Sequence, residues 1–215
     1  MPITGVVFDL DGVLLPESEV INIAAAKQAF QDAGYPLNEA EITSIPGQGS
    51  QTYVSRLLRV RGISSERDAE LIAVNRGNYD KLWPKMAVLA PHLDDVLRVL
   101  EERSIALAVA TTNRRFVVER FLTLFAHHPF RVVVASDDVV RHKPDPEVYR
   151  IAGERLGISA DNLLAVEDTF VGIQSAKAAE MRCAAIPNTF TKHQDFSQAD
   201  YRIGKLIELI EIINT

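Results

Sequence analysis

The sequence predicts an α/β fold, in which a doubly wound parallel sheet carries a helical insert after its first strand. Three observations support this prediction. A short apolar run, Val6–Phe8, is the right length for a buried strand. Residues 16–85 then show helical periodicity without a convincing strand. From residue 86 onward, apolar runs alternate with helical segments. Such alternation produces right-handed crossovers and a parallel sheet that is covered on both faces.

The helices of the insert are predicted from the spacing of apolar residues and from the residues that end each segment. Residues 20–30 repeat with a helical period, and a glycine and a proline soon afterwards end the helix. A second piece starts near Asn38. A third helix carries apolar side chains on one side between residues 53 and 58. A fourth begins after Ser64, a suitable N-cap, and runs to about Pro84.

The remaining elements follow in alternation and define the predicted domains. We expect strands at 105–110, 131–135, 162–166, 183–186 and, at the edge of the sheet, 200–203, with helices at 93–103, 115–125, 145–157, 170–181 and 205–213. The core domain would then consist of residues 1–15 and 86–215. Residues 16–85 would form the helical insert.

Composition excludes several classes of function. A net charge of -6 and a pI of about 5.4 argue against a nucleic-acid-binding surface. The single cysteine, Cys183, allows no internal disulfide, which fits a reducing cytoplasm. No charged-then-apolar leader opens the chain, and no apolar run approaches the length of a membrane span. We therefore expect a cytoplasmic protein with neither nucleic acid nor membrane as a partner. The sequence does not determine the oligomeric state, for which a monomer and a weak dimer are the alternatives.

Two aspartates follow the first strand directly. Asp9 and Asp11 are one residue apart and precede Gly12, where the chain turns. Carboxylates this close repel each other unless a cation lies between them or one stays protonated. At the carboxyl end of a buried strand, they indicate a magnesium site facing a phosphate. The alternative is a capped strand end with solvated acids.

Polar residues also follow the other predicted strands at the same edge of the sheet. Thr111 offers a hydroxyl, and the turn of Thr112 and Asn113 offers backbone N–H groups for phosphate oxygens. Lys143 would bring a positive charge to the crowded acids. Glu167 and Asp168 end another strand, so that Asp168 could supply a metal ligand. Taken singly, such residues are more often a strand-end hydroxyl, a solvated loop lysine and the acidic start of a helix than parts of a phosphate site.

Four ordered motifs make the chain similar to the haloacid dehalogenase superfamily, in the branch of small-molecule phosphatases and beta-phosphoglucomutase. The resemblance covers nearly the whole chain. The motifs are Val7-Phe-Asp9-Leu-Asp11-Gly12-Val13, Ala108-Val-Ala-Thr111-Thr112-Asn113, Lys143-Pro-Asp-Pro-Glu-Val-Tyr149 and Val166-Glu167-Asp168-Thr-Phe-Val-Gly172-Ile173.

The resemblance implies a role for each motif. Asp9 would be the nucleophile that forms an aspartyl-phosphate, and Asp11 the general acid and base. Thr111 would bind the phosphoryl group, and Lys143 would stabilise it together with the nucleophile. Asp168 would hold Mg²⁺ with Asp9 and Asp11, and Glu167 would be a further acidic contributor. The family also implies a Rossmann-like core with a mobile helical cap.

These implications predict a Mg²⁺-dependent phosphomonoester hydrolase that acts on a small phosphorylated metabolite. A phosphosugar mutase with the same chemistry is the alternative. Beta-phosphoglucomutases carry a cap histidine where this chain has Ile21, and a cap-loop arginine that residues 47–51 lack. A catalytically silent module that binds phosphorylated metabolites is a third possibility.

The cap loop Pro46-Gly47-Gln48-Gly49-Ser50-Gln51 is the segment expected to determine substrate specificity. Two glycines permit close backbone approach to a ligand. Gln48 and Ser50 are neutral hydrogen-bonding groups that suit a hydroxylated leaving group. A plain turn between helices with solvated polar side chains is the alternative for this loop.

Overall fold

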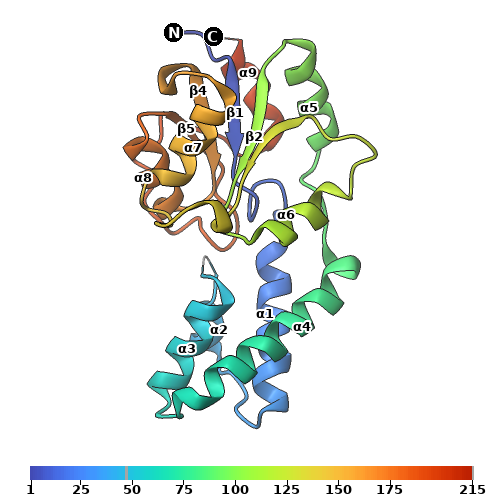
Figure 1. Ribbon diagram of the computed structural model, residues 1–215, viewed down its shortest axis with the longest axis vertical. Helices are drawn as coiled ribbons and strands as arrows, with labels where there is room; N and C mark the ends of the chain where they lie inside the picture. The colour runs from blue at the N-terminus through green and yellow to red at the C-terminus, as the bar shows by residue number, and fades with distance from the viewer. Residues whose placement is uncertain (47, 215) are drawn as a thin grey trace. The chain divides into compact units, whose positions relative to one another are not determined.

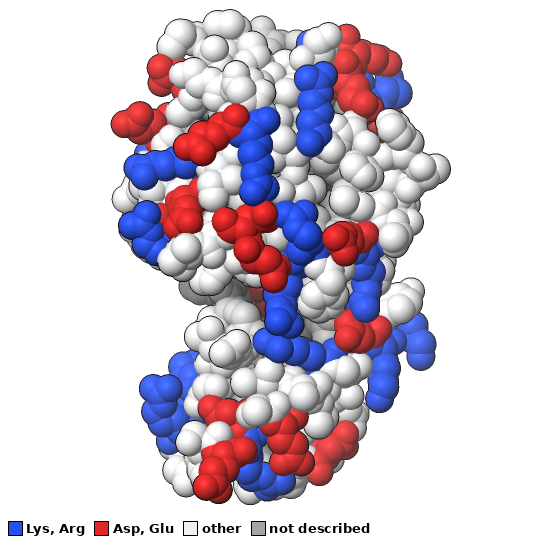
Figure 2. All heavy atoms as spheres, in the orientation of Figure 1, with Lys and Arg blue, Asp and Glu red and all other residues white. Residues whose placement is uncertain are grey.

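The structure is a computed structural model that describes residues 1–46 and 48–214. The chain divides into two compact units. The sheet unit consists of Met1–Pro16 and Leu89–Thr215, and the helical unit consists of Glu17–Val88. Within the described ranges, no helix has the length and apolar character needed to cross a membrane. On the face shown in Figure 2, acidic and basic side chains are interspersed.

The sheet unit confirms the predicted α/β class with a parallel sheet (Figure 1). Six described strands lie in the order β3-β2-β1-β4-β5-β6, and every neighbouring pair is parallel. The edge strand predicted around residues 200–203 is present but short. The strands are β1 (Gly5–Phe8), β2 (Ala106–Ala110), β3 (Phe130–Val134), β4 (Leu163–Glu167), β5 (Arg182–Ala185) and β6 (Tyr201–Arg202).

Strand β1 lies at the point where the order in which strands are added to the sheet reverses. The chain adds β2 and β3 on one side of β1 and β4, β5 and β6 on the other. Phe8, the last residue of β1, is in register with Val109 of β2 and Val166 of β4. The N–H group of Asp9 continues this ladder by donating to the carbonyl of Val166 at 3.0 Å. Ligands of doubly wound sheets bind at such a switch point, outside the carboxyl ends of the strands.

Helices cover both faces of the sheet (Figure 1). α7 (Glu147–Leu156) and α8 (Phe170–Ala178) pack on one face, and α5 (Leu93–Glu102) packs with α9 (Leu209–Ile213) on the other. α6 (Arg115–Leu122) connects β2 to β3. Strand and helix side chains interlock in one buried cluster, which includes Val7, Ala108, Ala165, Tyr149 and Ile173. This packing holds the carboxyl ends of the strands in fixed positions.

The helical unit contains α1 (Ser18–Asp32), α2 (Glu39–Thr43), α3 (Ser50–Val60) and α4 (Asp68–Met86). α4 packs against both α1 and α3. Asn38 and Glu41 form a capping box at the start of α2, since each side chain accepts a hydrogen bond from the other residue's backbone N–H. Ser64 accepts from the N–H of Glu66 and so caps the 3-10 turn before α4, as its position predicts.

Several predicted helix ends were wrong by a few residues. The helix predicted over 115–125 ends at Leu122, because the following residues form i→i+3 turns instead of helical bonds. The predicted helix 205–213 is a 3-10 turn over Leu206–Glu208 followed by the short α9. α4 continues through Pro84 to Met86.

The end of α8 has a specific cause. The helix stops at Ala178, and Glu180 adopts a left-handed conformation with φ 63°. The N–H group of Met181 then donates back to the carbonyl of Ala176 at 3.1 Å. Glycine usually occupies this position in such a helix end, because other residues there are sterically strained. The prediction that this helix extends to Met181 was therefore three residues too long.

Candidate active site

The polar residues predicted to converge are positioned by the ends of β1, β2 and β4 and by the loop before α7. Asp9 follows β1, and Thr111 follows β2. Glu167 is the last residue of β4, and Asp168 comes next. All four residues are buried. Lys143 belongs to the loop that leads into α7.

Lys143 lies between two carboxylates. Its Nζ donates to Asp9 Oδ1 at 2.7 Å, to Glu167 Oε1 at 2.7 Å and to the carbonyl of Ala110 at 3.0 Å. An ammonium group has three N–H donors, so these contacts use its full donor capacity. Two carboxylates therefore share one buried cation.

This shared cation shifts the protonation of the groups around it. Burial, followed by the neighbouring carboxylates of Glu167 and Asp11, raises the pKa of Asp9 to about 7, although Lys143 acts in the opposite direction. Burial alone would lower the pKa of Lys143. Its two carboxylate neighbours more than offset this and keep the pKa of the ammonium above its ordinary value. Lys143 thus stays charged, and the acids carry the excess negative charge.

Tyr149 of α7 also contacts Glu167. Its hydroxyl donates to Glu167 Oε1 at 2.7 Å, and its ring centroid lies 4.8 Å from Lys143 Nζ. Burial, together with the nearby carboxylates, raises the pKa of Tyr149 well above its ordinary value, so the phenol remains a donor. No role for Tyr149 was predicted from the sequence.

Asp11 is held differently from Asp9. Asn113 Nδ2 donates to Asp11 Oδ2 at 2.6 Å, and the N–H of Asn113 donates to Thr111 Oγ1 at 3.1 Å. An amide donor is neutral, so Asp11 has a different immediate environment from Asp9, which contacts an ammonium. Thr112 is exposed, and its part in phosphate binding stays a prediction.

Asp168 lies against the turn at Gly12. Asn188 Nδ2 donates to Asp168 Oδ2 at 2.7 Å. A Cβ atom on Gly12 would come within 2.1 Å of the same oxygen, and Gly12 has φ +78°. Only glycine leaves room for this carboxylate in that turn. Sequence reasoning missed Asn188, which lies in the loop after β5, where no acidic motif marks it.

The buried acids could hold a metal ion. One carboxylate oxygen from each of Asp9, Glu167 and Asp168 lies within 4.8 Å of the others. Hard divalent cations such as Mg²⁺ prefer oxygen ligands of this kind. The acidic donor set therefore fits the Mg²⁺ ion predicted from the sequence.

The two predicted cap residues lie in the helical unit and have partners there. Gln48 Nε2 donates to the carbonyl of Ser44 at 2.7 Å, and Arg56 Nε donates to Gln48 Oε1 at 3.3 Å. Arg76 Nε donates to Ser50 Oγ at 3.4 Å. Gly47 of the same loop lies outside the described residues. That Gln48 and Ser50 bind the leaving group stays a prediction.

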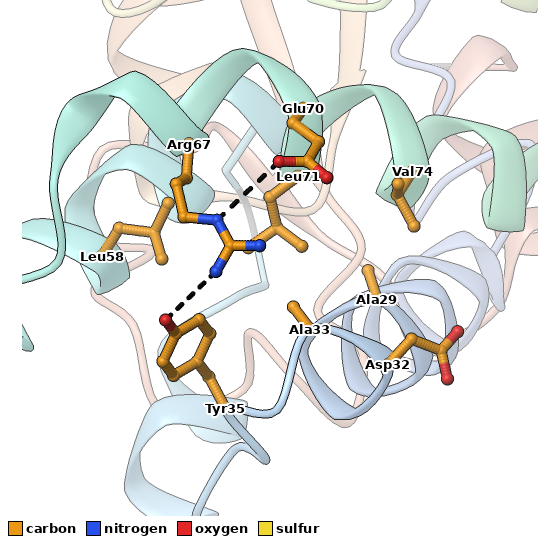
Figure 3. A pocket seen from close by; sticks show the side chains of 9 residues that line it. All are labelled: Ala29, Asp32, Ala33, Tyr35, Leu58, Arg67, Glu70, Leu71 and Val74. Carbon is orange, nitrogen blue, oxygen red and sulfur yellow. Dashed lines mark hydrogen bonds and ion pairs between the residues drawn. The ribbon is translucent and has the colours of Figure 1, made fainter.

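The helical unit also has a cavity of its own, about 150 Å³ in volume (Figure 3). Arg67 is one of its lining residues; its Nη1 donates to the Tyr35 hydroxyl at 3.2 Å, and its Nε lies 3.7 Å from Glu70 Oε2. Arg67 and Glu70 thus form an oppositely charged pair in the lining of this cavity. The described lining residues are Ala29, Asp32, Ala33, Tyr35, Leu58, Arg67, Glu70, Leu71 and Val74.

The family model for haloacid dehalogenase-like hydrolases matches residues 6–186 of this chain. This span contains all four motifs. It also contains Lys143 and its side-chain partners Asp9, Tyr149 and Glu167. It also includes the helical unit.

Similar proteins match over most of their length. Protein CbbY of Cereibacter sphaeroides is 28% identical, over 96% of this chain and 94% of its own. A phosphoglycolate phosphatase of Cereibacter sphaeroides (strain ATCC 17029 / ATH 2.4.9) is 29% identical, over 84% of this chain and 83% of its own. CbbY from Rhodobacter sphaeroides has been solved with phosphate and, as a mutant, with xylulose-(1,5)bisphosphate. Both structures have a TM-score of 0.85 and 28% identity, and cover 96% of each chain.

Proposed function

This chain belongs to the haloacid dehalogenase-like hydrolase family, and from this premise we propose that it is a Mg²⁺-dependent phosphomonoester hydrolase. The observation that carries the proposal is the different environment of two nearby carboxylates. Asp9 contacts the buried ammonium of Lys143, whereas Asp11 contacts the neutral amide of Asn113. Carboxylates in contrasting environments can take different roles in one reaction.

In the first step, an oxygen of Asp9 attacks the phosphorus atom of the ester. The bond between phosphorus and the leaving oxygen breaks, and Asp11 gives its proton to that oxygen. The product is an aspartyl-phosphate on Asp9 and a free alcohol. Lys143 holds the nucleophile at 2.7 Å and offsets part of the negative charge. Thr111 Oγ1 accepts from the N–H of Asn113, so its own proton can donate to a phosphate oxygen.

In the second step, water attacks the phosphorus atom of the aspartyl-phosphate. Asp11, now ionised, takes a proton from this water, and the bond between phosphorus and Asp9 breaks. Inorganic phosphate leaves, and both aspartates return to their starting protonation states. Asn113 holds Asp11 during both proton transfers through its 2.6 Å hydrogen bond.

Asp9, the main-chain carbonyl of Asp11 and Asp168 would hold Mg²⁺, with Glu167 as an additional acidic neighbour. When bound, the ion supplies the positive charge that keeps Asp9 ionised and offsets the charge of the phosphate. This need follows from the raised pKa of Asp9, about 7, which leaves the carboxyl partly protonated near neutral pH. Asn188 keeps Asp168 oriented through its 2.7 Å hydrogen bond.

Small phosphorylated metabolites are the substrate class we propose. One relative is named a phosphoglycolate phosphatase, and another was solved with a sugar bisphosphate. Both ligand names describe compact, hydroxylated or carboxylated phosphates. The acidic net charge of -6 gives no reason to expect a polymeric anion such as nucleic acid.

Hydrolysis of p-nitrophenyl phosphate with Mg²⁺ tests the proposal. Asp9→Asn should lower turnover by at least about a thousandfold, because the amide cannot act as the nucleophile. Asp94→Asn, a change at an exposed aspartate of α5, is the matched control and should keep full activity. Chelation of Mg²⁺ should abolish turnover, and its return should restore it.

A second measurement separates a nucleophilic Asp9 from one that only binds the metal. Wild-type protein quenched in acid during turnover should carry an acyl phosphate. Borohydride reduces its carbonyl carbon, which releases inorganic phosphate and leaves homoserine at Asp9. Reduction at another residue would contradict the assignment. So would full activity of Asp9→Asn, or turnover that persists in excess chelator.

A further inference from the structure

The carboxylate of Glu167 is surrounded by protein donors. Lys143 Nζ and the Tyr149 hydroxyl each lie 2.7 Å from Oε1. The N–H of Asp168 lies 3.2 Å from Oε2, and the Thr169 hydroxyl lies 3.3 Å from it. A carboxylate has about four acceptor sites, so these donors satisfy Glu167. One of these contacts holds Glu167 against Lys143.

Tyr149 contacts both members of this pair. Its hydroxyl donates to Glu167 and also lies 3.3 Å from Lys143 Nζ. The face of its ring lies 4.8 Å from the ammonium, within the range of a cation–π interaction. Tyr149 is fully buried in α7, inside the cluster that packs on the sheet. It is therefore a rigid surface next to two flexible charged side chains.

Lys143 needs such a support. Its side chain has four rotatable bonds, and it must keep Nζ 2.7 Å from Asp9 while Glu167 attracts it from the other side. A small movement of Glu167 would draw the ammonium away from Asp9. The Tyr149 hydroxyl restrains Glu167 Oε1, and the ring limits movement of the ammonium.

We propose that Tyr149 is a positioning residue, which keeps Lys143 against Asp9 by anchoring Glu167 and by covering one side of the ammonium. The consequence for catalysis rests on the proposed phosphatase function. The position of Lys143 itself does not, and it can be measured without turnover.

Tyr149→Phe tests this role, because it keeps the ring and removes only the hydroxyl. In p-nitrophenyl phosphate hydrolysis, we expect kcat to fall about tenfold or more while KM stays within about twofold, since the lost contact orients a catalytic group. The Mg²⁺ concentration for half-maximal activity should also stay within about twofold. The matched control is Tyr53→Phe, which removes another fully buried phenol hydroxyl, in the hydrophobic cluster of the helical unit. It should leave kcat unchanged.

The NMR signal of the Lys143 side-chain ammonium group supplies a readout that does not depend on phosphatase activity. The signal is assigned by its loss in Lys143→Arg. In Tyr149→Phe it should shift, and its protons should exchange with water faster, whereas Tyr53→Phe should leave it unchanged.

The outcomes separate the two proposals. An unchanged Lys143 signal with unchanged kcat in folded Tyr149→Phe would overturn the positioning role. A lower melting temperature with an unchanged signal would do the same, because it would show that the hydroxyl serves stability alone. Wild-type protein without phosphatase activity would overturn the proposed function only, since the amine signal would still report on Tyr149.

Discussion

Lys143 of the sheet unit and Arg61 of the helical unit both bind carboxylates, but their surroundings differ. The Lys143 side chain is 6% exposed, and it is shared by Asp9 and Glu167. Arg61 is 21% exposed and forms a two-point contact with a single acid, Glu41. Lys143, Asp9 and Glu167 therefore form a buried group with two acidic side chains and one basic side chain. Arg61 and Glu41 instead form a pair of one basic and one acidic side chain, which is partly exposed to solvent.

Arg61 serves a purely local purpose. It also donates to the carbonyls of Tyr35 at 2.8 Å and Pro36 at 2.9 Å, while Glu41 belongs to the capping box of α2. The pair thus ties the loop after α1 to α2 and to the C-terminal end of α3. A buried excess of negative charge, by contrast, is costly unless another cation joins it. The comparison teaches that charge balance and burial together distinguish a reactive ion-pair group from a structural one.

Lys143→Met should break the reactive group and produce the largest effect. Turnover should fall by at least about a thousandfold, because Asp9 loses the contact that positions it. Removal of one partner from a buried ion pair typically costs about 3 to 5 kcal/mol of unfolding free energy. Urea unfolding and p-nitrophenyl phosphate hydrolysis measure both effects. Lys205→Ala, at an exposed lysine, should change neither, and a Lys143→Met variant with wild-type stability would contradict the charge argument.

Two helical glycines sharpen the comparison between the units. A Cβ on Gly172 of α8 would come within 2.0 Å of the Glu167 carboxylate, whereas a Cβ on Gly77 of α4 would meet nothing within 4 Å. Gly172→Ala should therefore displace Glu167 and cost about 1 to 3 kcal/mol of stability, with a loss of turnover. Gly77→Ala should instead stabilise the protein by about 0.5 to 1 kcal/mol at unchanged activity. Equal effects of the two substitutions on the urea midpoint would show that crowding at Glu167 does not matter.

Glu41→Gln tests the balanced pair and should have a much smaller effect than Lys143→Met. Hydrogen bonds from Arg61, followed by the backbone bond to Asn38, hold the pKa of Glu41 below its ordinary value against the opposing effect of burial. A carboxyl whose pKa is lowered by folding stabilises the protein above its unfolded pKa, and this contribution is lost as the pH falls through the folded pKa. At pH 7 the substitution should cost about 1 to 2 kcal/mol in urea unfolding.

The lowered pKa of Glu41 also predicts how the difference in unfolding free energy between wild type and Glu41→Gln depends on pH. The gap between wild type and Glu41→Gln should shrink as the pH falls below the ordinary pKa of a glutamate, 4.5. p-Nitrophenyl phosphate turnover should stay at the wild-type level at neutral pH. A stability gap that grows toward acid pH would refute the assigned role of Glu41.

Most strands were predictable because each is a local apolar run. β1 and β4 end next to the aspartates that the sequence analysis identified. Helix ends were less predictable, because they depend on small differences in free energy between alternative backbone conformations. The i→i+3 turns after Leu122 and the left-handed conformation of Glu180 are examples. Asn188 escaped notice for another reason. A single asparagine in a loop belongs to no recognisable sequence motif. Its contact with Asp168 also joins the segments that follow two different strands, β5 and β4.

The sequence by itself determined the order of the elements, the parallel sheet and the motifs at its edge, because periodicity and strand ends are properties of neighbouring residues. Only the tertiary structure decided how those motifs interact. Lys143 and Asp9 are 134 residues apart along the chain, and the packing of α7 on the sheet brings their side chains to 2.7 Å. The same packing puts Tyr149 beside Glu167. Contacts between distant residues depend on how whole elements pack, and no local pattern records that.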